Sequence, residues 1–314
     1  MKIISEATAE KFVNLAVAKL SQYIKENNLK GVTTGISGGI DSAVVAVIGI
    51  QSIKRLVSSG YQASFKYFYL DCQSDHQDLI KANILAKRFN FNLEICDLSR
   101  WYEKSPLLAL IPKNHPQAKI AQGNIKARLR MIALYQFALL NNYIYLDTDD
   151  FSEKLMGFWT RHGDEGDVKL IQEVTKTEVY DLAEYFHIPE EILKSLPGDG
   201  IGVTQNNLAI EQLGLDYIYI EYIISRFVEQ GFDYNGSDQQ LKLSKFLELQ
   251  KIVAQEIYKP SNLIKKILER TLKTSYKRKF GDYAANLMPV RKKFGFLEFG
   301  TKAFNQKYLN AIIY

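Results

Sequence analysis

The sequence predicts an α/β fold: a doubly wound parallel sheet of the Rossmann type, with a helical extension at the C-terminal end. Short apolar runs alternate with longer helical patterns through the first half of the chain, and small polar or acidic residues directly follow several of the strands. In such sheets ligands bind at the carboxyl ends of the strands, where the strand order reverses. The polar residues after the strands are therefore the first candidates for a binding site.

The expected elements alternate between strand and helix. Strands are expected at residues 31–36, 65–70, 92–98 and 143–147, and helices at 6–27, 41–57, 76–88 and 124–141. Ser5 stands where a side-chain cap would begin the first helix. We expect residues 1–220 to form this sheet-containing unit, and residues 221–314 to form a helical, basic extension packed on it.

The composition argues against several classes of protein. The 314 residues are 46% apolar and 24% charged, an ordinary globular balance, and no apolar run is long enough to span a bilayer. Cys72 and Cys96 stand in unrelated contexts, so neither a disulfide framework nor a zinc site is indicated. Because the N-terminus also lacks a continuous apolar leader, we expect a cytoplasmic protein without a membrane partner.

A loop at residues 35–42, reading GISGGIDS, lies between an apolar strand and an apolar helix. Unpaired N–H groups in a first helical turn, together with the helix dipole, favour an anion, and glycine lets the backbone approach a phosphate closely. The loop is not of the Walker type, because no Gly-Lys-Ser/Thr follows. Asp41 instead suits a metal ion that bridges to phosphate oxygens.

Two further segments carry candidate residues. In helix 124–141, Asn124 and Arg128 stand four positions apart and so share a face, although arginines on helices are usually surface charges. The segment 148–167 is rich in acids, and a solvated loop explains many such runs. Glu153 is a better candidate, because it follows a strand end by one helical turn, at the sheet edge where Asp41 also lies.

Four blocks of the chain, in order, resemble the ammonia-dependent NAD synthetases, which belong to the ATP pyrophosphatases with an SGGxDS loop. They are GISGGIDSAVVA at 35–46, GNIKARLRM at 123–131, the segment 148–167, and TKTEVYDLAEYFHIPEEIL at 175–193. The resemblance implies an adenine nucleotide alpha hydrolase-like fold. It also implies that the carboxylate of deamido-NAD attacks the α-phosphorus of ATP, giving an acyl-adenylate and pyrophosphate, and that ammonia then displaces AMP.

The resemblance also implies roles for individual residues. For ATP binding these are Gly35, Ser37, Gly38, Gly39, Asp41, Ser42, Arg128, Arg130, Thr148 and Lys176. Asp41, Arg128 and Lys176 are expected to act in catalysis, and Asp41 and Glu153 to hold Mg²⁺. Contact with the second substrate is expected of Asp149, Phe158, Thr160, Asp164 and Asp167. The family further implies a homodimer, and helix 124–141 has apolar residues enough for both a sheet and a partner helix.

The sequence departs from the family mainly on the side of the second substrate. Asp147 stands where the family has a glycine, GDEGD at 163–167 is one residue shorter, and segments 196–200 and 206–209 lose a hydroxyl and an acidic pair. Three interpretations therefore stay open. The chain is an ammonia-using NAD synthetase or a relative that amidates another nicotinate nucleotide, a same-fold enzyme for another carboxylate or a tRNA base, or a non-catalytic nucleotide-binding protein.

The C-terminal region is basic within a chain of net charge +5. From Lys259 onward there are thirteen Lys and Arg against three acids, a surface that could face RNA, a polyphosphate or only water, with nucleic acid not expected. Two basic clusters, Lys277-Arg278-Lys279 and residues 291–293, flank a Gly- and Pro-containing segment. This pattern predicts a mobile flap, and one hypothesis is that the first cluster closes over the triphosphate.

Overall fold

The computed structural model describes residues 2–163, 165–198, 200–236, 243–279, 285–286 and 291–313. Its centre is a sheet of order β3-β2-β1-β4-β5-β6 in which neighbouring strands run parallel. The strands are β1 (Gly31–Gly35), β2 (Ser64–Asp71), β3 (Leu93–Asp97), β4 (Tyr143–Asp147), β5 (Val168–Lys169) and β6 (Ala285–Asn286). The expected parallel, doubly wound sheet is confirmed. Strand order reverses between β1 and β4, so the loops after these two strands meet.

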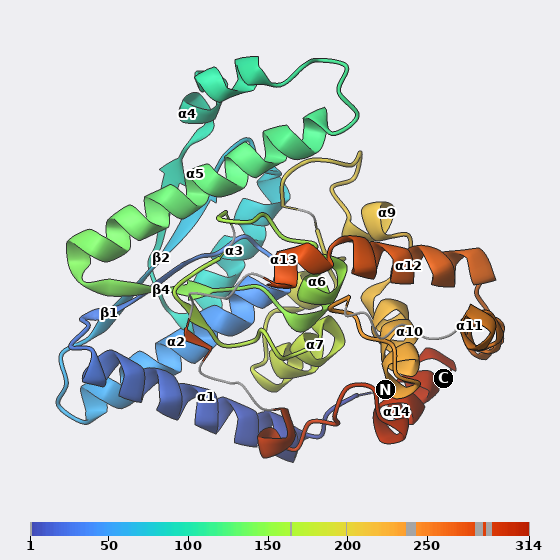
Figure 1. Cartoon of the computed structure of the whole chain (residues 1–314). Helices are drawn as coiled ribbons and strands as arrows, with labels where there is room; N and C mark the ends of the chain where they lie inside the picture. Colours follow the sequence, from blue (N-terminus) through green and yellow to red (C-terminus); the bar gives the residue numbers. More distant parts are fainter. Residues whose placement is uncertain are drawn as a thin grey trace.

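Helices cover both faces of the sheet (Figure 1). On one face α2 (Ile40–Ser58) packs between the strands and α1 (Glu6–Glu26), and α7 (Lys176–Tyr185) packs beside it. On the other face α5 (Ala118–Asn141) lies along β1 and β4. Because α2 has partners on several sides, it is apolar around most of its circumference. Among the described helices, none combines the length and apolarity needed to cross a bilayer.

The C-terminal part is helical and lies beside the α6–α7 end of the sheet (Figure 1). The remaining elements are α3 (His76–Phe89), α4 (Ser99–Glu103), η1 (Pro106–Leu110), α6 (Phe151–Met156), α8 (Glu190–Leu193), α9 (Ala209–Leu213), α10 (Tyr217–Glu229), α11 (Leu243–Glu256), α12 (Ser261–Lys273), α13 (Ser275–Lys279), η2 (Arg291–Phe294) and α14 (Lys302–Ile313). The expected boundary at residue 220 falls inside α10, and one hydrophobic core joins residues on both sides of it. The division into two units stays a prediction.

Two local expectations can be compared directly. The Ser5 side chain accepts a hydrogen bond from the Thr8 amide at 3.2 Å, so the predicted cap of α1 is confirmed. The helix expected from residue 124 begins at Ala118 instead. Gly123, which precedes the expected helix, lies inside α5, and a Cβ there would stand 2.7 Å from the Cβ of Ile201. The glycine serves close packing against a loop, which helical periodicity does not reveal.

The flap hypothesis is wrong for Lys277 and Arg278. The Lys277 ammonium donates to the carbonyl oxygens of Gly157 and Trp159, and the Arg278 guanidinium donates to those of Lys154 and Leu155, both at 3.0 Å. Burial lowers the pKa of Arg278 to about 10. These side chains fix α13 against the end of α6 and are not available to close over a substrate. The Lys279 side chain lies outside the described part of the chain.

Candidate active site

The loop after β1 is braced by its own residues. Gly38 has a φ of +81°, and a Cβ there would stand 2.6 Å from the carbonyl oxygen of Asp78, so glycine is required. The Ser42 hydroxyl accepts a hydrogen bond from the Ser37 amide at 3.2 Å and donates to the Gly39 carbonyl oxygen at 3.0 Å. The serine therefore holds the loop in shape at the N-terminus of α2. A 19-residue helix begins there and presents its dipole to an anion.

Two helices that enter the site both begin with a capping box. In α6 the Asp150 side chain accepts from the Glu153 amide at 2.9 Å, while Glu153 accepts from the Asp150 amide. In α7 the same exchange joins Thr175 and Glu178. The reciprocal bonds satisfy amides that a helix end leaves unpaired and fix where each helix starts. Lys176, the first residue of α7, is placed by the second box.

Lys176 gathers three carboxylates. Its Nζ lies 2.7 Å from Asp41 Oδ2, 2.8 Å from Asp150 Oδ2 and 2.9 Å from Glu153 Oε1. The lysine side chain is 2% exposed, and its partners come from α2 and from the start of α6. When all three carboxylates are ionised against one ammonium, two negative charges remain, which is the complement of one divalent cation.

Burial and charge shift the pKa values in this cluster. Burial raises the pKa of Glu153 to about 7, against the lowering effect of Lys176. Burial alone would lower the pKa of Lys176, but the carboxylates of Asp150, Asp41 and Glu153 raise it overall, so the ammonium stays protonated. The ring of Tyr217 lies 5.3 Å from the same ammonium. The cluster is thus a buried ammonium held by Asp41 and by two buried acids, Asp150 and Glu153, whose pKa values burial raises.

A cavity of about 450 Å³ opens beside this cluster, at the carboxyl ends of β1, β2 and β4. Most of the residues predicted for substrate or metal binding line it: Gly35, Ser37, Gly39, Asp41, Ser42, Arg130, Thr148, Asp149, Glu153, Phe158 and Lys176. Segments 195–198, 200–202 and 206–208 line it as well. Of the segments that depart from the family pattern, residues 196–198, 200 and 206–208 therefore line the cavity.

Helix α5 presents two different faces, which separates residues that the sequence grouped together. Lys126 and Arg130, four positions apart, line the cavity, and Arg130 donates to the carbonyl oxygens of Leu70 at 3.1 Å and Gly200 at 2.8 Å. Arg128 is exposed, does not line the cavity, and donates to the Arg161 carbonyl oxygen at 3.1 Å. Its predicted catalytic role gains no support from this placement.

Three other predicted residues stand apart from the cavity lining. Gly38 packs on Asp78 as described above. The Thr160 hydroxyl donates to Asn124 Oδ1 at 2.8 Å, and Asp167 Oδ2 accepts from the Tyr145 amide at 3.1 Å, so both act here as braces of the loop after β4. Asp164 lies outside the described residues.

Asp147, at the position where the family has a glycine, is 1% exposed. Its Oδ1 accepts from the Asp149 amide and its Oδ2 from the Gly166 amide, both at 2.8 Å. The Lys169 ammonium lies 3.8 Å away and is also buried. The carboxylate ties the loop after β4 to the segment before β5, so this departure is explained by local structure.

Sequence reasoning missed two residues of the site. Asp150 was counted only as part of an acidic run, although the Asp-x-x-Glu spacing after a strand end is the signature of a capping box. Lys126 was missed because the sequence pointed to the helix face that carries Asn124 and Arg128. Even with the helix start correctly placed at Ala118, the sequence would not have shown which face of the helix lines the cavity.

The switch point of a parallel sheet, a Gly- and Ser-rich loop at a helix N-terminus and a lysine held by carboxylates define an α/β protein with an anion-binding site at the edge of its sheet. The family model for NAD synthase matches residues 12–262, and the chain belongs to this family. Members are ATP-using ligases of NAD biosynthesis, and this chain is an enzyme of that kind. The interpretations as a tRNA-modifying enzyme or a non-catalytic protein are not favoured.

Relatives and solved structures agree with the assignment. The NH3-dependent NAD+ synthetase of Syntrophomonas wolfei is 33% identical over 211 residues, which are 66% of this chain and 81% of the relative. That of Thermococcus sibiricus is 28% identical over 273 residues, covering 86% and 94%. The NMN synthetase of Francisella tularensis has a TM-score of 0.65 at 23% identity, covering 87% and 97%, which shows a shared fold. The NAD+ synthetase of Burkholderia pseudomallei has a TM-score of 0.59 at 25% identity, covering 87% and 91%.

Proposed function

We propose that the protein amidates deamido-NAD with ammonia at the expense of ATP, releasing AMP and pyrophosphate. The observation that carries the proposal is the meeting of Lys176 with Asp41, Asp150 and Glu153 beside the loop at the N-terminus of α2. In this arrangement the loop amides and Lys176 lie where phosphates would bind, and the three carboxylates lie where a cation would neutralise their charge. Relatives that are NH3-dependent NAD+ synthetases support the choice of substrates.

In the first step a substrate carboxylate oxygen attacks the α-phosphorus of ATP, and the bond to pyrophosphate breaks. Loop amides at the start of α2 donate to oxygens of the leaving phosphates, and the helix dipole favours their charge. Lys176 lines the same cavity and is placed to reach these phosphates. Arg130, which lines the cavity, keeps the loop around Gly200 against α5. In the second step ammonia attacks the acyl carbon, AMP leaves, and the proton lost from nitrogen passes to solvent or phosphate.

The acidic cluster suits Mg²⁺. Asp41, Asp150 and Glu153 each offer a carboxylate oxygen, and these oxygens lie within 4.8 Å of one another. Oδ1 of Asp41 is buried and has no hydrogen-bond partner among the described residues. Hard oxygen donors are those that Mg²⁺ prefers, and the ion supplies charge neutralisation of phosphate oxygens when bound. We propose that Asp41 and Glu153 hold the ion while Asp150 pairs with Lys176.

A homodimer is the assembly that α5 supports. Ile132, Leu139 and Leu140 of this helix are 57%, 78% and 75% exposed, a large apolar surface for one helix. Ile132 and Leu139 stand seven positions apart and so lie on one face. We propose that a second copy covers this surface. A cytoplasmic location, which the two free cysteines suit, stays a prediction.

Incubation of the purified protein with ATP, Mg²⁺, ammonium and deamido-NAD tests the function. Equimolar AMP, pyrophosphate and NAD are expected, with little AMP when deamido-NAD is left out. A parallel reaction with nicotinate mononucleotide in place of deamido-NAD tests the related acceptor. AMP formation without any amide product, or no AMP at all, would contradict the proposal.

A further inference from the structure

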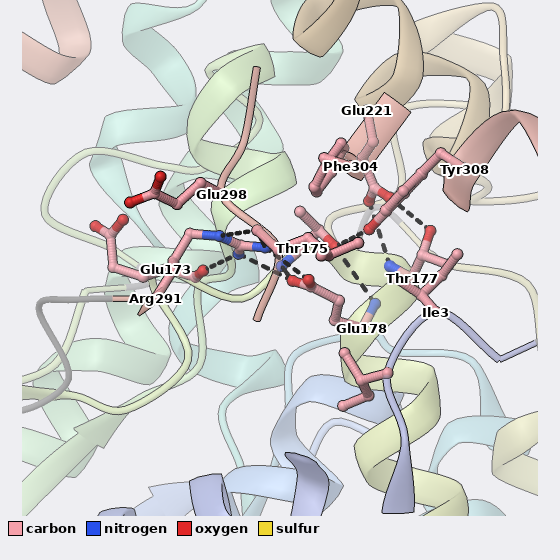
Figure 2. A network of polar contacts seen from close by, with 12 residues as sticks. Ile3, Glu173, Thr175, Thr177, Glu178, Glu221, Arg291, Glu298, Phe304 and Tyr308 are labelled. Carbon is pink, nitrogen blue, oxygen red and sulfur yellow. Dashed lines mark hydrogen bonds and ion pairs between the residues drawn. The ribbon is translucent and has the colours of Figure 1, made fainter. Parts of the chain in front are cut away.

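The C-terminal segment 291–313 lies outside the residues that match the family, yet it reaches the start of α7 (Figure 2). It is fastened to the body of the protein by aromatic packing. The ring centroid of Phe12 in α1 lies 5.4 Å from that of Phe294 and 5.3 Å from that of Phe296, and Phe304 stacks on Tyr308 at 4.1 Å. The segment is therefore part of the core, and it brings the side chains of Arg291 and Tyr308 to the start of α7.

Arg291 makes a bidentate ion pair with Glu178, a member of the α7 capping box (Figure 2). Its Nη1 lies 2.9 Å from Glu178 Oε2 and its Nη2 lies 2.6 Å from Glu178 Oε1. Both side chains are buried, at 9% and 0% exposure. The guanidinium also donates to the carbonyl oxygens of Glu173 and Leu297 and lies over the ring of Phe304. A bidentate arginine orients a carboxylate as well as neutralising it.

Tyr308 holds the other member of the same box. Its hydroxyl lies 2.6 Å from Thr175 Oγ1, and both residues are fully buried. Thr175 Oγ1 in turn accepts from the Glu178 amide, and Glu178 Oε2 accepts from the Thr175 amide at 2.9 Å. Each side chain of the capping box thus has a partner in the C-terminal segment.

Residues of α6 and α10 make a second set of contacts with the first turn of α7. The Lys176 amide donates to Ser152 Oγ at 2.9 Å, and that hydroxyl donates to Glu221 Oε1 at 2.5 Å. Glu221 Oε2 accepts from the Thr177 hydroxyl at 2.6 Å. The Thr177 amide donates to Glu221 Oε1 at 3.3 Å. The amides of the first three residues of α7 are thus all paired, which leaves the backbone of Lys176 little freedom.

We propose that Arg291 and Tyr308 are positioning residues for Lys176, so that the C-terminal segment sets the place of the ammonium among Asp41, Asp150 and Glu153. They contact no group of the cavity themselves and act through Thr175 and Glu178, the cap of the helix that begins with Lys176. A lysine at a helix start is otherwise unfavourable against the dipole, so its place has to be imposed by neighbours. The inference rests on the proposed role of Lys176 in binding the ATP phosphates.

A double-mutant cycle tests the coupling. Tyr308→Phe removes one hydroxyl and preserves the ring that stacks on Phe304, and Lys176→Met removes the ammonium. Affinity is measured by titration calorimetry with Mg²⁺ and α,β-methylene-ATP. This analogue cannot be cleaved between its α- and β-phosphates, so the measurement does not depend on NAD formation. Tyr308→Phe is expected to weaken binding about three- to tenfold in the wild-type background and to have no effect in the Lys176→Met background.

Tyr222→Phe is the matched control, since the Tyr222 hydroxyl is also in a buried residue and donates to Glu256 at 2.7 Å, away from α7. It should lower the melting temperature without changing analogue affinity. AMP affinity should stay unchanged in the Tyr308→Phe variant, because AMP lacks the β- and γ-phosphates. Equal losses in both backgrounds, a loss shared with Tyr222→Phe, or Lys176→Met binding the analogue like the wild type would each overturn the inference.

Arg291→Lys extends the test, because it retains the charge but loses the bidentate geometry. Affinity for the analogue is expected to fall at least as far as in Tyr308→Phe, and an unchanged affinity would count against the role of Arg291. If the wild-type protein makes no NAD but shows the expected coupling, the proposed function is wrong and the positioning role of Arg291 and Tyr308 still holds. If the protein makes NAD but shows no coupling, the proposed function holds and the positioning role is wrong.

Discussion

The Lys176 ammonium lies 2.7 Å from the Asp41 carboxylate, across 135 positions of sequence, and joins the first turn of α7 to that of α2. Lys176→Met is expected to abolish most AMP formation, because the phosphates lose their buried cation. It should also cost about 3–5 kcal/mol of unfolding free energy, because the fully buried Asp150, whose pKa burial already raises, loses the cation that offsets its burial. Urea denaturation and AMP release at saturating ATP measure the two effects.

A double variant separates the two consequences. Lys176→Met with Asp150→Asn removes the stranded carboxylate but keeps a good N-cap residue for α6. Most of the lost stability should return while turnover stays low. Recovery of turnover together with stability would show that Lys176 serves the fold and does not act on ATP.

The two proposed metal ligands can be neutralised without loss of helix structure. Asp41→Asn and Glu153→Gln are each expected to lower AMP formation by at least about a hundredfold, since each removes an anionic ligand from Mg²⁺. Glutamine at position 153 can still complete the capping box with Asp150, so the melting temperature should change little. Near-normal turnover at saturating Mg²⁺ in either variant would show that its carboxylate is not a ligand.

Ammonia, and not glutamine, is expected to be the direct nitrogen donor. Glutaminase chemistry needs an activated nucleophile, usually a thiolate. Burial raises the pKa of the Cys72 thiol, and Cys96 has its pKa raised in the same way. Rates of NAD formation with ammonium chloride and with glutamine, assayed after removal of contaminating glutaminase, give the answer. Equal rates with the two donors would contradict the expectation, and Cys72→Ser would then locate the nucleophile.

Much of the fold and part of the site could be predicted from the sequence. Helices and strands with strong periodicity, and the polar residues that follow β1 and β4, could be placed because parallel strands bring their carboxyl ends to one edge. Lys176 was predicted by resemblance and Glu153 also from its place after a strand end, and the structure brings both to Asp41.

The missed features depend on contacts between distant segments. The sequence of α5 alone does not distinguish the face that lines the cavity from the face that holds Arg128. The first contacts the loop at Gly200 and the second contacts the carbonyl oxygen of Arg161, and both partners are distant in sequence. The partners of the C-terminal basic residues could not be predicted from the sequence for the same reason. Arg278 and Arg291 are structural cations whose partners are carbonyls or an acid far away in sequence.

The exposed end of α5 predicts the oligomeric state. Leu139→Glu places a charge in the apolar surface that includes Ile132 and Leu140, and is expected to shift a dimer toward monomer, because a charge buried at an interface carries a large desolvation cost. Light scattering at micromolar concentration measures the mass. Val57→Glu is the control, since Val57 is 54% exposed on α2 and should leave the mass unchanged. A monomeric wild-type protein would refute the dimer.

Glu221 should make stability depend on pH. Its side chain is fully buried, and burial raises the pKa to about 8, although hydrogen bonds from Ser152 and Thr177 lower it. A carboxyl with a raised pKa in the folded state binds more protons there than in the unfolded chain. The free energy of unfolding therefore falls as pH rises between the unfolded pKa, near 4.5, and about 8.

Glu221→Gln removes this titration and keeps the shape of the side chain. Between the two ends of that pH range, the wild type is expected to lose about 4 kcal/mol more than the variant. Urea denaturation at several pH values measures the difference, and Glu256→Gln, whose carboxylate is partly exposed and paired with Arg226, serves as the control. Parallel pH profiles for wild type and Glu221→Gln would mean that the Glu221 carboxylate is ionised at little cost, held by the three donors of Ser152 and Thr177. A steeper fall in the wild type alone would show that the polar network beneath Lys176 is tightest when Glu221 carries its proton.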